Sequence, residues 1–199
     1  EVLSRKPEYV YQIEKERAGS YQIEVLAKSK EHEVPITLRF QELRDEQMQP
    51  AHGELPFFLQ ENTVIQFLQY PYEQVVAENF VEILEKMELI NDLSCYEEIY
   101  GILKKEALDG RKVEQQIIEV GTKRELFFGK DRLDTVLHYK DYTYMKRKWT
   151  AYLKRERKKE PDWVEVMTLL EAFFPPVWRA IIRDEIFIGD WMPELCRFL

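Results

Sequence analysis

Hydrophobic and polar residues alternate along the first third of the chain. Three runs alternate in this way: Tyr9–Ile13, Tyr21–Val25 and Ile36–Phe40. Because successive side chains of a strand point to opposite faces of a sheet, a period of two predicts half-buried strands. Pro35 opens the third run, a position where strands tolerate proline. Residues 44–60 hold two prolines and a glycine with little periodicity, so we expect a loop there, followed by a fourth strand at Val64–Leu68.

From Tyr72 onward the hydrophobic residues recur at intervals of three and four, which indicates amphipathic helices. The first of these stripes extends from Val75 to Met87. Equivalent patterns predict further helices at 96–103, 113–118, 133–138, 142–157, 163–174 and 177–183, and a short terminal helix at 191–199. We expect Asp109-Gly110 to end the second helix of the chain and Pro175-Pro176 to end the sixth.

Strands therefore come first and helices second, which is the pattern of an α+β fold. We expect a small, mostly antiparallel sheet in a β-rich part at residues 1–71 and a helical bundle in a domain at residues 72–199. Hydrophobic residues at 45% and aromatic residues at 13% suffice for a packed core. No apolar run reaches the roughly eighteen residues of a membrane span, and two cysteines do not make a disulfide framework. We expect a cytoplasmic protein without membrane contact.

One segment departs sharply from the acidic average of the chain. The net charge of the whole chain is −8, yet residues 140–159 carry nine basic and two acidic side chains, a local charge of +7. The basic residues that we single out as candidate nucleic-acid contacts are Lys146, Arg147, Lys148, Lys154, Arg155, Arg157, Lys158 and Lys159. Tyrosines and Trp149 are interleaved with them and could stack on unpaired bases. Alternatively, the aromatic residues belong to the core and the basic face is solvated or paired with acidic residues elsewhere in the chain, or the partner is an acidic protein.

The stretch GSYQIEVLAKSKEHE follows the outline of a nucleotidyltransferase active site. Such a site uses a Gly-Ser turn for a triphosphate and an acidic pair for magnesium, here Gly19-Ser20 and the glutamates of Glu31-His32-Glu33. However, the alternation after Ser20 indicates a strand rather than the expected helix, and aspartate is the usual ligand in this role. We therefore favour two hairpin turns and the strand between them.

The order of segments gives a broader resemblance. Three segments follow one another in a recognisable order: YQIEVLAKSKEHEVPITLRFQEL at 21–43, VVAENFVEILEKMELINDLSCYEEIYGILKK at 75–105, and the segment from YKDYTYMKRKW to FFPPVW at 139–178. In this order the chain resembles the AbiEii-type nucleotidyltransferase-like proteins, toxins of type IV toxin–antitoxin and phage-defence systems. The similarity extends over residues 20–182 and includes Ala77-Glu78 and the Asn91-Asp92 pair.

The resemblance implies nucleotide transfer from a nucleoside triphosphate with Mg²⁺ to tRNA or another RNA, and a cognate antitoxin as partner. It implies catalytic roles for Glu78 and Asp92. Asn79 stands where the family has a lysine, and the family's Gly-Ser and Asp-x-Asp segment is not found. We therefore expect either a C-terminal portion of a longer protein or a degenerate member. The alternative is a non-enzymatic module that binds protein or nucleic acid through the basic helix at 142–159.

Both candidate catalytic residues also have a simpler interpretation. Glu78 belongs to a row of glutamates with Glu82, Glu85 and Glu88 at helical spacing, which is typical of a solvated helix face. Asp92 precedes a predicted helix, where a carboxylate commonly caps the first backbone amides. No histidine or cysteine stands at metal-ligand spacing, so we expect no zinc site and assign no residue as a metal ligand.

Overall fold

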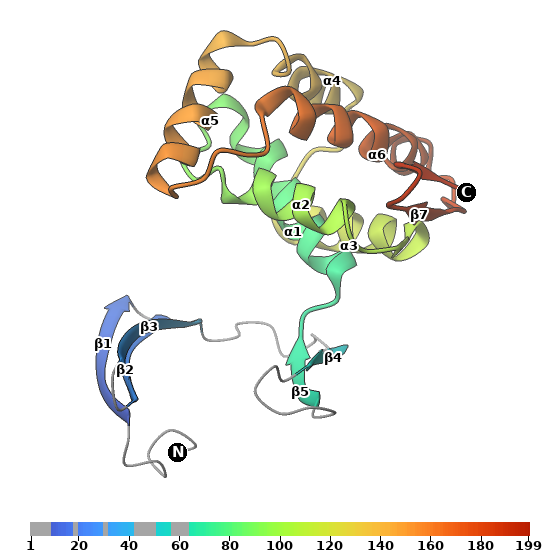
Figure 1. Ribbon diagram of the computed structural model, residues 1–199. Helices are drawn as coiled ribbons and strands as arrows, with labels where there is room; N and C mark the ends of the chain where they lie inside the picture. The colour runs from blue at the N-terminus through green and yellow to red at the C-terminus, as the bar shows by residue number, and fades with distance from the viewer. Residues whose placement is uncertain (1–8, 18–19, 30–31, 42–50, 57–63) are drawn as a thin grey trace. The chain divides into compact units, whose positions relative to one another are not determined.

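The computed structural model describes residues 9–17, 20–29, 32–41, 51–56 and 64–199 (Figure 1). Antiparallel strands precede a set of helices, which confirms the predicted α+β class. Contacts between residues divide the chain into two compact units, residues 1–49 and residues 50–199. The division into domains at 71/72 stays a prediction, although the last strand before the helices ends at Gln69 and the first helix begins at Tyr72.

The first unit contains a three-stranded antiparallel meander. Its strands are β1 (Tyr9–Arg17), β2 (Ser20–Ser29) and β3 (His32–Gln41), in the spatial order β1-β2-β3. Ile13 pairs with Ile23, and Ile23 pairs with Leu38, so apolar positions of the three alternating runs share a register. Pro35 does not open β3 as expected but lies inside it. Because β3 is an edge strand of this sheet, it tolerates proline, which has no backbone N–H to donate to a neighbouring strand.

A second hairpin joins β4 (Ala51–Pro56) and β5 (Val64–Gln69). The strand predicted at Val64–Leu68 is confirmed, but the expectation of a loop at 44–60 is wrong over Ala51–Pro56. Gly53 pairs with Phe67 within this ladder, so pairing with a well-formed strand outweighs the weak strand preference of glycine. The rest of the predicted loop lies outside the described residues.

The helices form around one continuous core. They are α1 (Tyr72–Lys86), the 3₁₀ turn η2 (Met87–Leu89), α2 (Ser94–Leu103), α3 (Gly110–Lys123), α4 (Lys130–His138), α5 (Thr143–Arg155) and α6 (Trp163–Arg183). Helix α1 packs on α2 and α3, while α6 contacts α2, α3, α4 and α5 (Figure 1). Phe80 of α1 stacks on Phe174 of α6 with ring centroids 3.7 Å apart, and Trp178 meets Phe80 edge-on at 5.8 Å. These rings join the first and last helices of the core.

Helix α6 continues through Pro175-Pro176, so the prediction that the prolines separate two helices is wrong. A proline inside a helix costs about 3 kcal/mol because it removes a hydrogen bond and crowds the preceding turn. The residues flanking the pair, Phe173, Phe174 and Val177, are fully buried. Burying a side chain of this size contributes about 1.5–3 kcal/mol, so packing on both sides offsets the local cost.

The C-terminus is also not helical as expected. Strands β7 (Asp190–Met192) and β8 (Arg197–Phe198) form a small antiparallel sheet with β6 (Leu108–Asp109), in the order β6-β7-β8. Trp191 lies opposite both Leu108 and Phe198, is fully buried, and donates its indole N–H to the Leu103 carbonyl at 2.8 Å. These long-range contacts hold the segment in extended form.

Asp109-Gly110 begins a helix instead of ending one. Helix α2 already stops at Leu103. The Asp109 side chain accepts hydrogen bonds from the backbone amides of Arg111 at 3.0 Å and Lys112 at 3.1 Å, which caps the N-terminus of α3. The prediction therefore assigned the aspartate and glycine to the wrong end of a helix.

Candidate nucleic-acid interface

The basic segment forms α5 and the turn that follows it. Met145, Trp149, Tyr152 and Leu153 are buried on one side of the helix. Trp149 is only 1% exposed and donates its indole N–H to the Pro161 carbonyl at 2.8 Å, which holds the returning chain against α5. The alternative that Trp149 and Tyr152 belong to the core is thus confirmed, and neither ring is free to stack on a base.

Two of the candidate lysines are engaged in contacts that hold the fold. Lys148 donates to the carbonyl of Glu88 at 3.1 Å and also to the carbonyl of Ile90. Lys158 lies 2.5 Å from a carboxylate oxygen of Glu97, which also accepts a hydrogen bond from the Tyr152 hydroxyl. Burial alone would raise the pKa of Glu97, but the hydrogen bonds from Lys158 and from the tyrosine more than offset it, so the pKa is lowered.

The other basic side chains are paired weakly or not at all. Lys146 lies 3.6 Å from the exposed carboxylate of Asp141, and Arg155 bonds to its neighbour Glu156 at 2.9 Å. Exposed pairs of this kind contribute only about 0–1 kcal/mol. Four more side chains have no ion-pair or hydrogen-bond partner among the residues that the structure describes: Arg147, Lys154, Arg157 and Lys159.

The turn after α5 places Lys158 and Lys159 beside the helix. Arg157 adopts a left-handed conformation with φ of 56°. The amide of Lys158 donates to the Leu153 carbonyl at 2.8 Å, and that of Arg157 donates to the Lys154 carbonyl at 3.2 Å. These two bonds form a Schellman motif, which reverses the chain at a helix C-terminus. The chain then reaches α6, where Asp162 caps the first turn.

A groove of about 570 Å³ lies between α5, this turn and the start of α6. Lys146, Thr150 and Lys154 follow one another at intervals of four on α5, so they share a face. The full lining is Lys146, Trp149, Thr150, Leu153, Lys154, Lys158, Lys159, Asp162, Trp163 and Val164. The groove therefore combines four lysines with an apolar wall. The basic positions were predictable, but Trp163 and Val164 as neighbours of α5 were not.

The two predicted catalytic residues have structural partners. Glu78 pairs with Arg124, whose guanidinium also lies 3.6 Å from Glu85 and 3.9 Å from Glu82, so the glutamate row of α1 surrounds one arginine at the end of α3. Asn79 donates to the carbonyl of Val75 and to Glu98 at 3.0 and 2.9 Å. Glu78 does not line the basic groove. A catalytic role for it stays a prediction.

Asp92 lies at the start of α2, as its capping interpretation requires. Its carboxylate accepts a hydrogen bond from the Ser94 amide at 3.0 Å, although Leu93 holds the N-cap position itself. This bond satisfies one of the free amides at the helix start. The structure therefore gives Asp92 a local structural role, and its catalytic role stays a prediction.

The GSYQIEVLAKSKEHE stretch folds as strands. Ser20 is the first residue of β2 and lies opposite Arg17, and Glu33 lies in β3 opposite Lys28. The strand predicted after Ser20 is thus confirmed, whereas Glu33 lies in a strand and not in the turn expected there. Gly19 and Glu31 lie outside the described residues.

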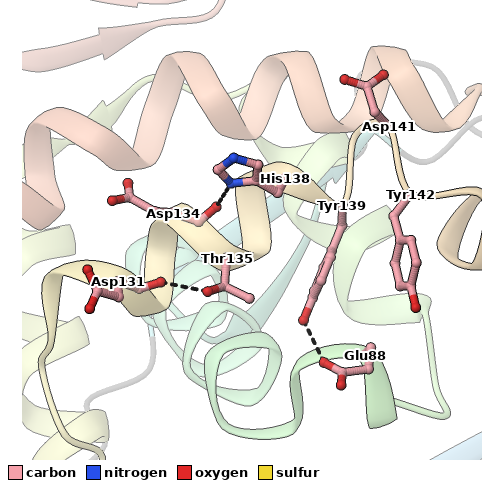
Figure 2. A pocket seen from close by; sticks show the side chains of 8 residues that line it. All are labelled: Glu88, Asp131, Asp134, Thr135, His138, Tyr139, Asp141 and Tyr142. Carbon is pink, nitrogen blue, oxygen red and sulfur yellow. Dashed lines mark hydrogen bonds between the residues drawn. The ribbon is translucent and has the colours of Figure 1, made fainter.

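A second pocket, of about 680 Å³, is lined by acidic and aromatic residues around α4 (Figure 2). Its lining is Glu88, Asp131, Asp134, Thr135, His138, Tyr139, Asp141 and Tyr142. Sequence analysis did not identify it, although Asp131, Asp134 and His138 stand at helical spacing. Among the residues that the structure describes, no group of three or more carboxylate, histidine or cysteine side chains is arranged to hold a metal ion.

Only some polar groups of the acidic pocket have partners among the described residues. Figure 2 shows the Tyr139 hydroxyl pointing at Glu88, to which it donates at 2.7 Å, and this hydrogen bond lowers the pKa of Glu88. His138 Nδ1 lies 2.6 Å from the Asp134 carbonyl, and Thr135 donates to the carbonyl one turn before it at 2.8 Å. The histidine and threonine therefore bond to their own helix.

Comparison of the chain with protein-family models, curated proteins and solved structures finds no match. Within the described part of the chain, no helix is both long and apolar enough to cross a membrane. The geometry and charge of the basic groove are therefore the features that bear on function.

Proposed function

We propose that this chain binds nucleic acid through the groove between α5 and α6. The observation that carries the proposal is the group of lysines around this groove, of which Lys154 and Lys159 have no partner among the described residues. Phosphate groups neutralise such side chains and release counterions, which is the main source of affinity in nucleic-acid binding. A local positive surface on a chain of net charge −8 would also steer a polyanion to this one place.

Ion pairs and the helix dipole neutralise only part of the positive charge of residues 154–159. Residues 154–159 carry five basic side chains, and Glu156 and Glu97 neutralise two of them. The dipole at the C-terminus of α5 offers about half a negative charge more. An excess of more than two positive charges remains within six residues, and their mutual repulsion is relieved when an anionic polymer binds.

RNA is the polymer that the resemblance to AbiEii-type proteins suggests, with tRNA as one candidate and the cytoplasm as location. The order of segments over residues 20–182 supports this choice. Under this proposal the chain supplies the surface that faces the RNA, whether or not it takes part in nucleotide transfer.

The test compares binding of a fluorescent, unstructured RNA at several salt concentrations. Lys154→Gln/Lys159→Gln removes the two unpartnered lysines of the groove, and Lys105→Gln/Arg179→Gln makes the same charge change at two exposed residues outside it. Each phosphate contact on a single strand contributes about −0.7 to the slope of log K against log salt. We expect the groove variant to bind more weakly, with a slope shallower by about 1.4.

The control variant should keep the wild-type slope and nearly the wild-type affinity. Absence of wild-type binding at low salt would refute the proposal. An equal loss in both variants would also contradict it, because affinity would then follow overall charge rather than the groove. Preference for an acidic polypeptide over RNA would favour the alternative partner.

A further inference from the structure

We infer that the basic groove accepts an unpaired base, so its ligand is a single strand rather than a duplex; this inference rests on the proposed function. The groove is not uniformly polar. Trp149 and Leu153, which are buried, precede Thr150 and Lys154 by one position each, so the floor beside the polar stripe of α5 is apolar. Val164, which is 43% exposed, adds an accessible apolar surface from the first turn of α6.

The size of the groove fits one nucleotide. A volume of about 570 Å³ lies within the range of pockets that hold small organic ligands. A duplex keeps its bases stacked inside and presents mainly phosphate and sugar. Phosphates could reach the lysines from a duplex, but the exposed surface of Val164 would stay in water. An unpaired base would cover that surface, which gives the single strand an additional favourable contact.

Charge within the groove orients the ligand. Asp162 is the one carboxylate among the described residues of the lining, and its oxygen accepts the Glu165 amide at 2.8 Å. Because this carboxylate occupies the N-terminus of α6, it repels a phosphate from there. The phosphates therefore belong with Lys146, Lys154 and Lys159, and the base belongs against Val164.

The exposed tyrosines are a poorer place for the base. Tyr142 and Tyr144 are 47% and 42% exposed, with ring centroids 5.9 Å apart. However, Tyr142 lines the acidic pocket together with Glu88 and Asp141. A strand whose bases stacked there would bring its phosphates close to these carboxylates, so the basic groove is the better site.

The test uses three ligands of equal length: an unstructured RNA strand, the same strand with abasic sites, and its duplex. The wild-type chain should bind the intact strand most tightly. Val164→Ser should weaken that binding about fivefold, an effect of roughly one buried methyl-sized group, and leave abasic binding and the salt slope unchanged. Val164→Trp should strengthen binding of the intact strand alone, by about tenfold, through stacking.

Ile182→Ser is the matched control, since Ile182 is 39% exposed on the same helix but outside the groove. It should bind all three ligands like wild type. Equal affinity for intact and abasic strands, or tighter binding of the duplex, would overturn the inference while salt-dependent binding still supported the proposed function. Absence of binding to all three ligands would refute both.

Discussion

The basic groove and the acidic pocket are similar in size and opposite in charge, and each contains both paired and unpaired polar groups. In the acidic pocket, Tyr139 donates to Glu88 and His138 contacts a backbone carbonyl of its own helix (Figure 2), while the carboxylates of Asp131 and Asp134 have no partner among the described residues. In the groove, Lys154 and Lys159 have no partner among the described residues. Charge alone therefore does not mark a binding surface, because many charged clusters serve the fold itself.

A packed aromatic pair lies beneath the basic groove. The groove rests on Trp149 and Trp163, whose ring centroids are 5.7 Å apart and whose indole N–H groups both donate to backbone carbonyls. The lysines at its rim thus project from a rigid base. Rigid support reduces the ordering cost of binding, so changes to this support should affect both stability and binding.

The largest expected effect comes from Trp149→Ala. Trp149 is 1% exposed and stacks near Tyr152, so its removal should lower the free energy of unfolding by about 3–5 kcal/mol. Urea denaturation followed by circular dichroism measures this loss. Trp149→Phe keeps most of the volume but loses the bond to Pro161, and should cost less. Tyr144→Ala, at an exposed site, should change stability by no more than about 0.5 kcal/mol.

A loss below about 1 kcal/mol in Trp149→Ala would contradict the inference that packed tryptophans support the groove. RNA binding by Trp149→Phe adds a second observation. If the tryptophan holds the 156–162 turn in place, Trp149→Phe should bind RNA more weakly than wild type even where both chains are fully folded. The reason is that Lys158 and Lys159 depend on that turn for their position.

Local periodicity predicted the helical part of the groove, and it gave burial of the aromatic residues as one of the alternatives. The stripe through Met145, Trp149 and Leu153 has the spacing of a helix face, and the lysines fall beside it. The other wall could not be predicted, because Val164 is brought beside α5 by a turn whose geometry depends on Arg157 in a left-handed conformation. Arginine carries no strong signal for that conformation.

Long-range contacts explain the main errors in the fold. Trp191 forms a hydrogen bond to Leu103, 88 residues away in the sequence. The local pattern, which favours a terminal helix, contains no information about this contact. Pro175-Pro176 normally end a helix, but Phe174 stacked on Phe80 keeps α6 intact. In both cases tertiary packing outweighs a local preference, which is the usual limit of single-sequence reasoning.

An intermediate effect is expected for Glu97→Gln, which weakens the link between the groove and the core. Glu97 accepts hydrogen bonds from both Lys158 and Tyr152, so its charge should contribute about 1–2 kcal/mol to the free energy of unfolding. Its pKa is lowered in the folded chain. This contribution is therefore present above the unfolded pKa of about 4.3 and is lost as the pH falls through the lower folded value.

Denaturation at pH 7 and at about pH 3 measures this effect. Wild type should lose more stability than Glu97→Gln over that interval, and the two should be closest at the acid end. Glu98→Gln is a neighbouring control with a different partner, Asn79. An equal pH dependence in wild type and Glu97→Gln would show that Lys158 is not held by this carboxylate and is as free as Lys154.

The smallest effect is expected in the acidic pocket, from Tyr139→Phe. The ring stays buried, and only the hydroxyl that donates to Glu88 is lost. Because that hydrogen bond is the main cause of the lowered pKa of Glu88, the pKa should return toward its ordinary value. NMR titration of the glutamate side chain measures the shift, and RNA affinity should stay unchanged since Tyr139 lies outside the basic groove.

Tyr142→Phe is the control, because the Tyr142 hydroxyl has no hydrogen-bond partner among the described residues. This variant should leave the Glu88 titration as it is. A loss of RNA binding in Tyr139→Phe would mean that the two regions act together, and the contrast in charge between the pocket and the groove would no longer locate the binding surface.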